Sequence, residues 1–514
     1  MPIISALPLV ANAELYQEHT SIIAAEGAFT YRQLLDASAK VASNLLDGTN
    51  DLQEKRVAFL IPPSFHYVAT QWGIWRAGGI AVPLCVSHPR SELEYVIDDS
   101  GAEIVVAHPD FAASLRPIAE TRKLRFVLTT QALGHPPLML PPIDASRRAM
   151  IIYTSGTTSK PKGVVTTHQK IQAHVTALVS AWEWTASDHI LHVLPLHHVH
   201  GIINGLTCAL WAGATCEILP KFDTEEVWQR FIHGNVTLFM AVPTIYFKLI
   251  EAWEAASPAQ QKIMSAACAR LRLMISGSAA LPVNVLERWK EITGHVLLER
   301  YGMTEIGMAL SNPLRGQRVP GGVGMPLPDV EVKLVDENGD EAASGTPGEI
   351  WVKGPGVFIE YWGKPEATQR AFRDGWFCTG DVAVVENGVY RILGRRNIDI
   401  IKTGGYKVSA LEIEEVLRTH PQIKDCAVVG LADDEWGERV GAALVLKPGS
   451  VVTPDSLRNW AKTRLAAYKI PTRILVLDEL PRNAIGKVVK PKIVELSKRF
   501  CPQSFILTNS SQLD

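Results

Sequence analysis

Short apolar runs and amphipathic segments alternate through residues 1–150. Runs of four to six apolar residues with few charges are typical of buried parallel strands, whereas apolar residues spaced three or four apart indicate helices. The predicted strands are 56–61, 81–84 and 104–107, and the predicted helices start at 30, 64 and 90. Residues 134–146 are rich in proline and predict a loop. This alternation predicts a doubly wound α/β layer.

The same alternation returns in residues 168–310, where polar residues follow the strands. Predicted strands at 191–194, 236–242, 271–275 and 296–298 are each followed by small, polar or ionisable residues. Ligands of open α/β sheets lie beyond the carboxyl ends of the strands. The pattern therefore predicts an active site at this edge.

The pattern of residues changes after residue 310. Glycine- and proline-rich segments up to residue 393 predict a small β subdomain attached to the first region. A helix is expected after Ser409, with Glu412 placed to complete a capping box. We therefore expect an α/β fold with two parts: a large N-terminal region of doubly wound α/β layers with its β subdomain, and a small α+β C-terminal domain, the lid. The expected boundaries are 1–393 for the large region, 394–400 for a hinge, 401–505 for the lid and 506–514 for a tail.

Composition excludes several classes of protein. The chain has 514 residues, 47% of them hydrophobic, and a formal net charge of −2, so nothing favours nucleic acid or an acidic membrane as partner. Seven scattered cysteines without a C-x-x-C pair argue against a disulfide framework or structural zinc. No apolar run approaches the ~20 residues of a membrane span. Residues 1–16 lack Lys and Arg, and the final Gln-Leu-Asp is no peroxisomal signal, so we expect a cytoplasmic protein, with mitochondrial association left open.

A loop with the composition of a phosphate cradle follows the apolar run 149–152. Glycine permits close backbone approach, hydroxyl groups and amides donate hydrogen bonds, and lysines add charge. Pro161 and Gly163 distinguish the loop from a Walker A motif, which needs Gly-Lys-Ser/Thr at the start of a helix. The alternative is an ordinary solvated loop. The candidate nucleotide-binding residues are Thr154, Ser155, Gly156, Thr157, Thr158 and Lys162.

Five stretches in order give the chain a family resemblance. They are 153–164, 194–201, 301–305, 379–381 with 394–395, and 481–487. Together they resemble the acyl-adenylate-forming enzymes, which include the acyl-CoA synthetases. The resemblance implies two steps, in which a carboxylate attacks the α-phosphate of ATP to give acyl-AMP and pyrophosphate, and a thiol then displaces AMP. It implies ATP, Mg²⁺ and coenzyme A as cofactors and substrates.

The resemblance also implies roles for single residues. Glu305 is expected to bind Mg²⁺, a role that suits a hard oxygen ligand, and Thr304 to donate to the α-phosphate. Lys487 is expected to bridge the acid and the α-phosphate as a point charge on a flexible stem. The remaining nucleotide contacts are expected to be Tyr301 stacked on adenine, and Asp381 and Arg395 at the ribose.

The expected thiol side involves the lid. Gly404 and Gly405 lie in a turn that, in acyl-CoA synthetases, faces the active site only after the lid rotates, and His198 is expected to line the thiol channel. The hinge should follow Arg395, but the segment up to Asp399 is one residue longer than the common spacing. The sequence therefore leaves open which hinge residue absorbs the rotation.

The acid substrate is indicated by a narrower resemblance. Segments 194–201, 220–223, 276–279, 298–305 and 311–313 resemble the malonyl-CoA synthetases. A dicarboxylate needs a fixed cation for the carboxylate that does not react, and Arg300, at the expected end of a strand, can offer a bidentate fork. His200 and Ser276 could add donors. The structural alternative is that Arg300 pairs with Glu299 or Asp223.

These observations predict an AMP-forming malonate–CoA ligase with small-molecule partners. The alternatives are a ligase for methylmalonate, oxalate or a short monocarboxylate, an adenylation enzyme that loads a carrier-protein thiol, and a non-catalytic nucleotide-binding protein. The sequence does not indicate the oligomeric state.

Overall fold

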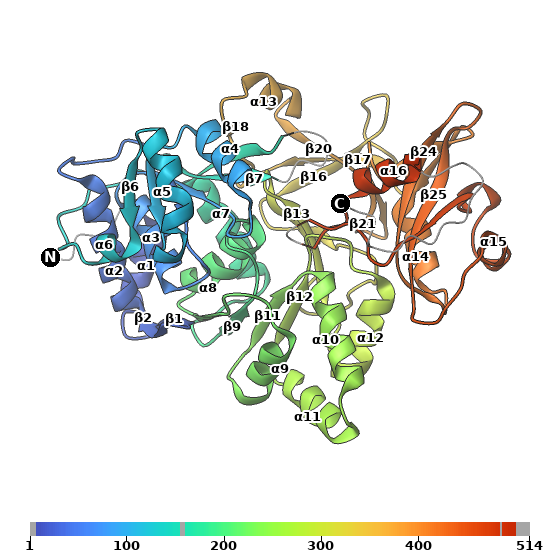
Figure 1. Ribbon diagram of the computed structural model, residues 1–514, viewed down its shortest axis with the longest axis horizontal. Coiled ribbons are helices and arrows are strands. Elements are labelled where there is room, and N and C mark those ends of the chain that lie inside the picture. Colours follow the sequence, from blue (N-terminus) through green and yellow to red (C-terminus); the bar gives the residue numbers. More distant parts are fainter. Residues whose placement is uncertain (1–6, 155–159, 484–485, 500–514) are drawn as a thin grey trace.

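The computed structural model describes residues 7–154, 160–483 and 486–499. Figure 1 shows a large region, coloured from blue to yellow, and a smaller orange and red unit beside it. The large region is built on two mostly parallel sheets with helices packed against them. The predicted α/β fold class, with its smaller C-terminal unit, is confirmed.

The first large sheet has seven strands in the order β18-β8-β7-β4-β3-β5-β6. Strands β7, β4, β3, β5 and β6 are parallel, β8 runs antiparallel to β7, and β18 runs antiparallel to β8. The strands span Arg56–Leu60 (β3), Ile80–Pro83 (β4), Ile104–Ala107 (β5), Arg125–Leu128 (β6), Arg148–Thr154 (β7), Lys162–Thr167 (β8) and Glu360–Tyr361 (β18).

The second large sheet has nine strands in the order β15-β14-β13-β12-β11-β9-β10-β1-β2. Its central strands are parallel, so their carboxyl ends share one edge. The strands span Thr20–Ala24 (β1), Gly27–Thr30 (β2), His189–His192 (β9), Thr215–Ile218 (β10), Leu238–Ala241 (β11), Leu273–Ser276 (β12), Leu298–Met303 (β13), Gly307–Ser311 (β14) and Met325–Pro326 (β15).

One edge of this sheet joins distant parts of the chain. Strand β1 pairs in parallel with β10, and the Thr215 hydroxyl donates to the backbone oxygen of Thr20, 195 residues away. The chain builds most of the seven-stranded sheet between these two strands.

Two smaller sheets complete the fold. The β subdomain consists of Glu331–Val335 (β16), Gly348–Lys353 (β17), Phe372–Arg373 (β19), Trp376–Glu386 (β20) and Val389–Arg395 (β21). The lid sheet consists of Ile400–Thr403 (β22), Tyr406–Ser409 (β23), Ile423–Asp433 (β24), Gly437–Leu446 (β25) and Arg473–Val476 (β26). The lid has apolar cores of its own, one under α14 and α15 and one under α16.

Helices begin where the sequence supplies caps. The Thr30 side chain accepts from the Gln33 N–H in a capping box, and the Ser64 hydroxyl accepts from the Tyr67 N–H. The helices span Pro8–Leu15 (α1), Tyr31–Leu46 (α2), Phe65–Arg76 (α3), Arg90–Ser100 (α4), Ala112–Thr121 (α5), Thr129–Leu133 (α6), His168–Ala181 (α7), Cys208–Trp211 (α8), Thr224–His233 (α9), Pro243–Ala255 (α10), Pro258–Cys268 (α11), Val283–Thr293 (α12), Pro365–Ala371 (α13), Ala410–Arg418 (α14), Pro454–Ala461 (α15) and Lys490–Arg499 (α16). Shorter helical segments are Pro109–Phe111 (η1), the π-helix His200–Thr207 (η2) and Ala467–Lys469 (η3).

Two local predictions of strand ends need correction. Strand β13 continues through Arg300 and Tyr301 because it forms a hairpin with β14, so these residues do not lie beyond a strand end. Asp381, which the sequence did not assign to an element, lies inside β20, since β20 pairs along its length with β17 and β21. Strand β9 ends at His192, two residues before the predicted end, and the chain turns toward η2.

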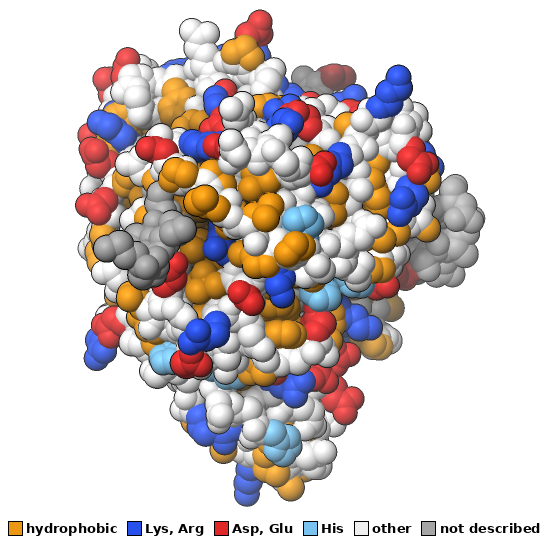
Figure 2. Space-filling model, turned by 90° about the vertical axis from the view of Figure 1, so that its left-hand side faces the viewer, with side chains coloured by type: hydrophobic (Ala, Val, Ile, Leu, Met, Phe, Trp, Pro, Cys, Tyr) orange, Lys and Arg blue, Asp and Glu red, His pale blue; other side chains and the backbone are white. Residues whose placement is uncertain are grey.

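On the face seen in Figure 2, basic and acidic side chains are interspersed, and neither kind gathers into a large patch. This mixture agrees with the net charge of −2. Among the described residues, no helix combines the length and the apolar character needed to cross a membrane.

Candidate active site

The carboxyl ends of β11, β12 and β13 and the neighbouring β subdomain bring most of the described candidate residues together. Glu305 is buried, and one of its oxygens accepts a hydrogen bond from the Tyr361 hydroxyl at 2.9 Å. The Lys162 ammonium lies 4.7 Å from the centre of the Tyr361 ring. Burial raises the pKa of Glu305, while the Tyr361 hydrogen bond and the charges of Arg395 and Lys162 oppose that rise.

This arrangement fits a magnesium ion that is held mainly by a nucleotide. The described residues contain no group of three or more His, Cys, Asp or Glu side chains that could hold a metal by themselves. Mg²⁺ in nucleotide-dependent enzymes is commonly bound by one or two carboxylates together with phosphate oxygens and water. Glu305 supplies such a carboxylate, with its second oxygen free of the Tyr361 bond.

The predicted ribose residues Asp381 and Arg395 form one network across three strands with Tyr301, the residue predicted to stack on adenine. The Tyr301 hydroxyl donates to Asp381 Oδ2 at 2.7 Å, and Arg395 Nε donates to Asp381 Oδ1 at 3.0 Å. The Asp381 N–H is held by the Thr379 hydroxyl at 3.0 Å. Arg395 Nη2 donates a third, longer bond of 3.5 Å to Asp381 Oδ2. A carboxylate has about four acceptor sites, so Asp381 keeps capacity for a ribose hydroxyl group.

The predicted acid-binding residues are buried and carry unused hydrogen-bonding groups. Arg300 is 4% exposed, and neither its Nε nor its Nη2 has a partner among the described residues. The Ser276 hydroxyl and His200 Nε2 are also buried without a partner there. His200 Nδ1 lies 2.9 Å from the Ser278 hydroxyl. Buried polar groups are nearly always satisfied, so this cluster can receive a polar ligand.

The electrostatics of the pocket favour an anion. Burial lowers the pKa of Arg300 to about 10, so the guanidinium stays charged at neutral pH. Burial and the charge of Arg300 hold the pKa of His200 well below its usual value, so His200 is neutral. Burial raises the pKa of Glu299 to about 8, so this neighbour does not neutralise Arg300 at pH 7.

The alternative in which Arg300 forms a structural salt bridge is wrong for the described residues. Arg300 forms no ion pair in the part of the chain that the structure covers, and its Nε and Nη2 lack a hydrogen-bond partner there. Glu299 instead accepts from the Leu281 N–H at 3.0 Å, and Asp223 caps α9 by accepting from the Glu226 N–H.

Gly277 lets the guanidinium pack against the backbone. A Cβ atom at this position would lie only 2.3 Å from Arg300 Cζ. The glycine therefore gives Arg300 its place, a role that is not evident from the sequence of the segment 276–279.

The histidine motif continues from the acid pocket toward the first sheet. The rings of His197 and His198 lie 4.1 Å apart, and that of His88 lies 5.9 Å from His197. Burial and the charge of His88 lower the pKa of His198 to about 4. A neutral, largely buried ring suits the wall of a channel, so the predicted role of His198 stays a prediction.

Lys487 is carried by a short turn of the lid. The Lys487 N–H donates to Asn483 Oδ1 at 2.9 Å, and the side chain is exposed. A Cβ atom on Gly486 would lie 3.1 Å from the hydroxyl of Thr244, at the start of α10. The turn therefore lies against the carboxyl edge of the nine-stranded sheet. An ion pair of 3.0 Å between Lys424 and Glu251 joins the same two parts of the molecule.

Other candidates lie elsewhere or beyond the described residues. Gly404 and Gly405 form the turn between β22 and β23, where the Gly404 N–H donates to the Trp436 backbone oxygen. Ser155, Gly156, Thr157 and Thr158 lie outside the described residues. Of the same loop, the Thr154 hydroxyl lies 3.5 Å from the backbone oxygen of Lys162.

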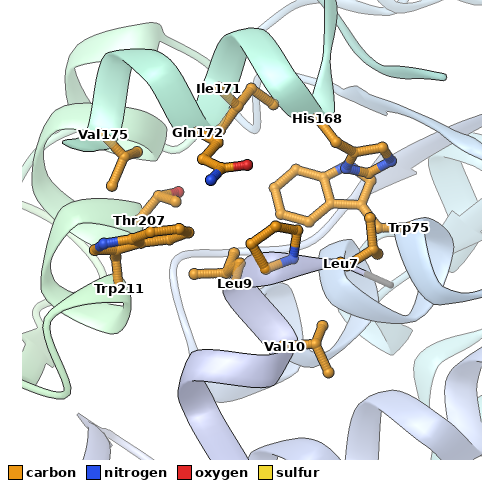
Figure 3. Close-up of a pocket in the computed structure, with 11 residues that line it drawn as sticks. Leu7, Leu9, Val10, Trp75, His168, Ile171, Gln172, Val175, Thr207 and Trp211 are labelled. Carbon is orange, nitrogen blue, oxygen red and sulfur yellow. The ribbon is translucent and has the colours of Figure 1, made fainter. Parts of the chain in front are cut away.

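Two cavities lie in the described part of the large region, and one of them is at the candidate site. One adjoins Thr304 and is also lined by Lys170, His174 and Val199. The other, shown in Figure 3, is apolar and lies between α1, α3, α7 and α8, where Trp75 meets the buried His168 ring. None of the candidate residues lines this second cavity.

One further residue of the site could not be predicted from the sequence. Tyr361 meets Glu305 across 56 residues, and no local pattern marks it.

Comparison with known proteins gives the same picture. The family model described as AMP-binding enzyme matches residues 9–362, and the model described as AMP-binding enzyme C-terminal domain matches residues 412–487. The chain is 47% identical to the mitochondrial malonate–CoA ligase ACSF3 of Mus musculus, over 95% of this chain and 90% of that protein.

Solved structures extend the comparison. The structure of ATP-bound MatB from Rhodopseudomonas palustris superposes with a TM-score of 0.89 at 33% identity, covering 96% of this chain and 99% of that one. The apo form of MatB, with the same coverage and 34% identity, gives 0.79. The arrangement of this chain is thus more similar to the ATP-bound form. The chain belongs to the AMP-binding enzyme family.

Proposed function

We propose that this protein is a malonate–CoA ligase that forms malonyl-AMP and pyrophosphate from malonate and ATP, and then malonyl-CoA and AMP from malonyl-AMP and coenzyme A. The observation that carries the proposal is the buried, unpaired guanidinium of Arg300, with the free donors of His200 and Ser276 beside it. The similarity to malonate–CoA ligase of Mus musculus supports the same substrate.

The acid pocket separates the two ends of the substrate. Arg300 and its neighbours hold the distal carboxylate in a nearly dry site, where charge-assisted hydrogen bonds are strong. The reacting carboxylate then points toward Thr304 and Glu305, which follow Arg300 on the same segment. Orientation of this kind replaces a bimolecular encounter by a positioned attack.

The first step brings two anions together, so the chain must supply positive charge and donors. Glu305 would hold Mg²⁺, which neutralises phosphate charge when bound. Lys162 and Lys487 add cations, and Thr154 and Thr304 add hydroxyl donors. Tyr301, Asp381 and Arg395 fix the nucleoside, so that the α-phosphate stays in reach of the acid.

The second step requires a thiol to reach the acyl carbon. We expect the lid to rotate, so that the Gly404–Gly405 turn replaces the Lys487 turn at the site. The narrow glycine turn would let the thiol approach past the neutral ring of His198. Coenzyme A is the acceptor proposed here, because the relative from Mus musculus is named as a CoA ligase.

A panel of acids tests the proposal. Purified protein is incubated with ATP, Mg²⁺ and coenzyme A and with malonate, methylmalonate, oxalate, acetate or propionate, and acyl-CoA is measured by mass spectrometry. Malonate should give the highest kcat/KM. A preference for propionate over malonate would contradict the proposal, and pyrophosphate release without acyl-CoA would point to another thiol acceptor.

The compartment is a separate question. The cytoplasmic prediction stays a prediction, whereas the relative from Mus musculus is named as mitochondrial. Cell fractionation with the tagged full-length protein would decide between the two.

A further inference from the structure

A second buried cation lies outside the pocket described above. Lys490, the first residue of α16, is 9% exposed, and its ammonium lies 2.5 Å from Asp399 Oδ1 and 2.8 Å from Glu414 Oε1. Burial by itself would lower the pKa of Lys490, but the two carboxylates raise it above its usual value. The side chain is therefore a charged, fully compensated group inside the protein.

Asp399 connects this ammonium to the end of the large region. Its Oδ2 accepts from the N–H of Arg395 at 2.9 Å, and Arg395 is the last residue of β21. Its backbone oxygen accepts from the N–H of Ala410, the first residue of α14. A Cβ atom on Gly394 would lie 2.3 Å from Asp399 Cβ, so this contact depends on glycine. One carboxylate thus touches both parts of the molecule at the predicted hinge.

Glu414 fixes the other side of Lys490 inside the lid. Its Oε1 also accepts from the Val428 N–H at 2.8 Å, and its Oε2 accepts from Arg418 at 3.1 Å. These bonds join α14 to β24, so Glu414 is a rigid anchor for the lysine.

The Lys487 turn lies between Lys490 and a second ion pair. Arg482 binds Asp425 at 2.6 Å, and its other nitrogen donates to the backbone oxygen of Gly486 at 2.6 Å. An antiparallel bridge between Arg482 and Val488 closes the turn. The position of Lys487 is therefore set by Arg482 on one side and by Lys490 on the other.

We propose that Lys490 is a positioning residue of the first half-reaction. It connects Asp399, at the joint between the large region and the lid, to the segment that carries Lys487. While its ammonium holds both carboxylates, Asp399 keeps its bond to Arg395 and the Lys487 turn stays against Thr244. Without it, Asp399 and Glu414 face each other as like charges, and the joint loosens. The catalytic part of this inference rests on the proposed function, and the geometric part does not.

A cysteine pair measures the geometric part without any substrate. A Cβ atom on Gly486 would lie 4.0 Å from Thr244 Cβ, within the range of about 3.5–4.5 Å that disulfides require. The full-length variant Thr244→Cys/Gly486→Cys should therefore cross-link under mild oxidation, as read from the linked peptide by mass spectrometry. Adding Lys490→Met should lower the initial cross-linking rate severalfold, and Lys490→Arg should restore most of it.

The matched control is Lys492→Met, which removes the same charge from an exposed position on the same helix. It should leave the cross-linking rate unchanged. An unchanged rate in Lys490→Met would overturn the proposal, as would an equal loss in the control. Since Lys490→Met strands two carboxylates, Asp399→Asn serves as a second variant. The double variant Lys490→Met/Asp399→Asn should lower the cross-linking rate no more than either single change, because both changes break the same contact.

The two half-reactions test the catalytic part. In Lys490→Met, pyrophosphate release with malonate and ATP should fall about ten- to a hundredfold, since an ångström of misplacement can cost that much. Formation of malonyl-CoA from supplied malonyl-AMP should stay close to the parent rate. Equal loss in both steps would mean that Lys490 only stabilises the lid. If the parent protein does not activate malonate, the proposed function fails, while the cross-linking result still decides the geometry.

Discussion

Arg300 and Lys490 are both buried cations, but they are compensated in opposite ways. Lys490 is bound by two carboxylates of the protein itself. Arg300 has no carboxylate within reach among the described residues, and two of its nitrogens lack any partner there. A buried charge is costly unless it is paired. The difference indicates where a ligand binds. The paired cation Lys490 stabilises the fold, whereas the unpaired cation Arg300 is available to bind an anionic ligand.

The largest effect is expected from removing the unpaired cation. In Arg300→Ala, the distal carboxylate of malonate is left buried without a partner, which costs on the order of 3–5 kcal/mol, or about a hundred- to several-thousand-fold in kcat/KM. Acetate and propionate have no second charge and should be unaffected or improved. Arg300→Lys should recover only part of the loss, because a point charge cannot replace a planar fork.

Rapid-quench measurement of acyl-AMP formation with malonate and propionate checks this. Arg318→Ala is a suitable control, since Arg318 donates to the backbone oxygens of Pro313 and Leu314 and not to the pocket. Equal loss with both acids in Arg300→Ala would make Arg300 a structural residue like Lys490.

Lys487 is a third cation, and it differs from Arg300 and Lys490 because its side chain is exposed. The proposed function places it at the α-phosphate. Lys487→Ala should lower adenylation about a hundred- to a thousandfold, comparable to the loss of one preorganised transition-state donor. Thioester formation from supplied malonyl-AMP should persist. Both rates can be followed in single-turnover assays with Lys492→Ala as control, and a parallel loss would count against two lid orientations.

A smaller effect should follow from moving Arg300 without removing it. In Gly277→Ala the new methyl group would lie 2.3 Å from the guanidinium carbon, so the side chain must shift. We expect kcat/KM for malonate to fall about tenfold or somewhat more, with little change for propionate. Gly354→Ala, whose Cβ would lie 3.2 Å from its nearest neighbour in the β subdomain, should leave both acids unchanged. A uniform loss in Gly277→Ala would indicate a folding defect.

The smallest effect concerns pH. Because burial raises the pKa of Glu299 to about 8, its carboxyl is protonated at pH 7 and ionises as the pH rises through that value. The carboxylate then competes with malonate for Arg300, so KM for malonate should rise severalfold above pH 8. Glu299→Gln should abolish that rise while keeping the acceptor for the Leu281 N–H.

The Glu299 carboxyl also predicts the direction in which the unfolding free energy changes with pH. A carboxyl whose folded pKa lies above its unfolded value of about 4.3 destabilises the native state as pH rises between the two values. The unfolding free energy of the parent should therefore fall relative to Glu299→Gln by up to about 1.4 kcal/mol per pH unit from pH 4.3 to 8. Thermal unfolding of both proteins across this range measures the difference, and a constant difference would contradict the assignment.

Much of the fold follows from local signals in the sequence. The predicted helix that starts at residue 90 is α4, Arg90–Ser100, because a polar-and-apolar segment between two buried strands leaves little choice. The predicted parallel strands are correct for β11 and β12, and the Ser278 hydroxyl that follows β12 lies 2.9 Å from His200 Nδ1.

The remainder depends on contacts between distant residues. Tyr361 reaches Glu305 from β18, and Lys490 reaches Asp399 across 91 residues, so no window of sequence reveals either partner. Strand β13 extends past its apolar run because β14 supplies hydrogen bonds to it, which hydrophobic periodicity cannot register. The roles of the candidate residues stay predictions until the variants are measured.

The pairing of β1 with β10 has a consequence for synthesis of the chain. Thr20 and its partner Thr215 are 195 residues apart, so at about 5–20 residues per second the ribosome delivers β10 roughly ten to forty seconds after β1. During that time β1 can pair only with β2, and its other edge offers unsatisfied backbone groups. A nascent chain of this protein thus carries a hairpin with one open edge, which exposes it to chaperones or to aggregation before the nine-stranded sheet closes over it.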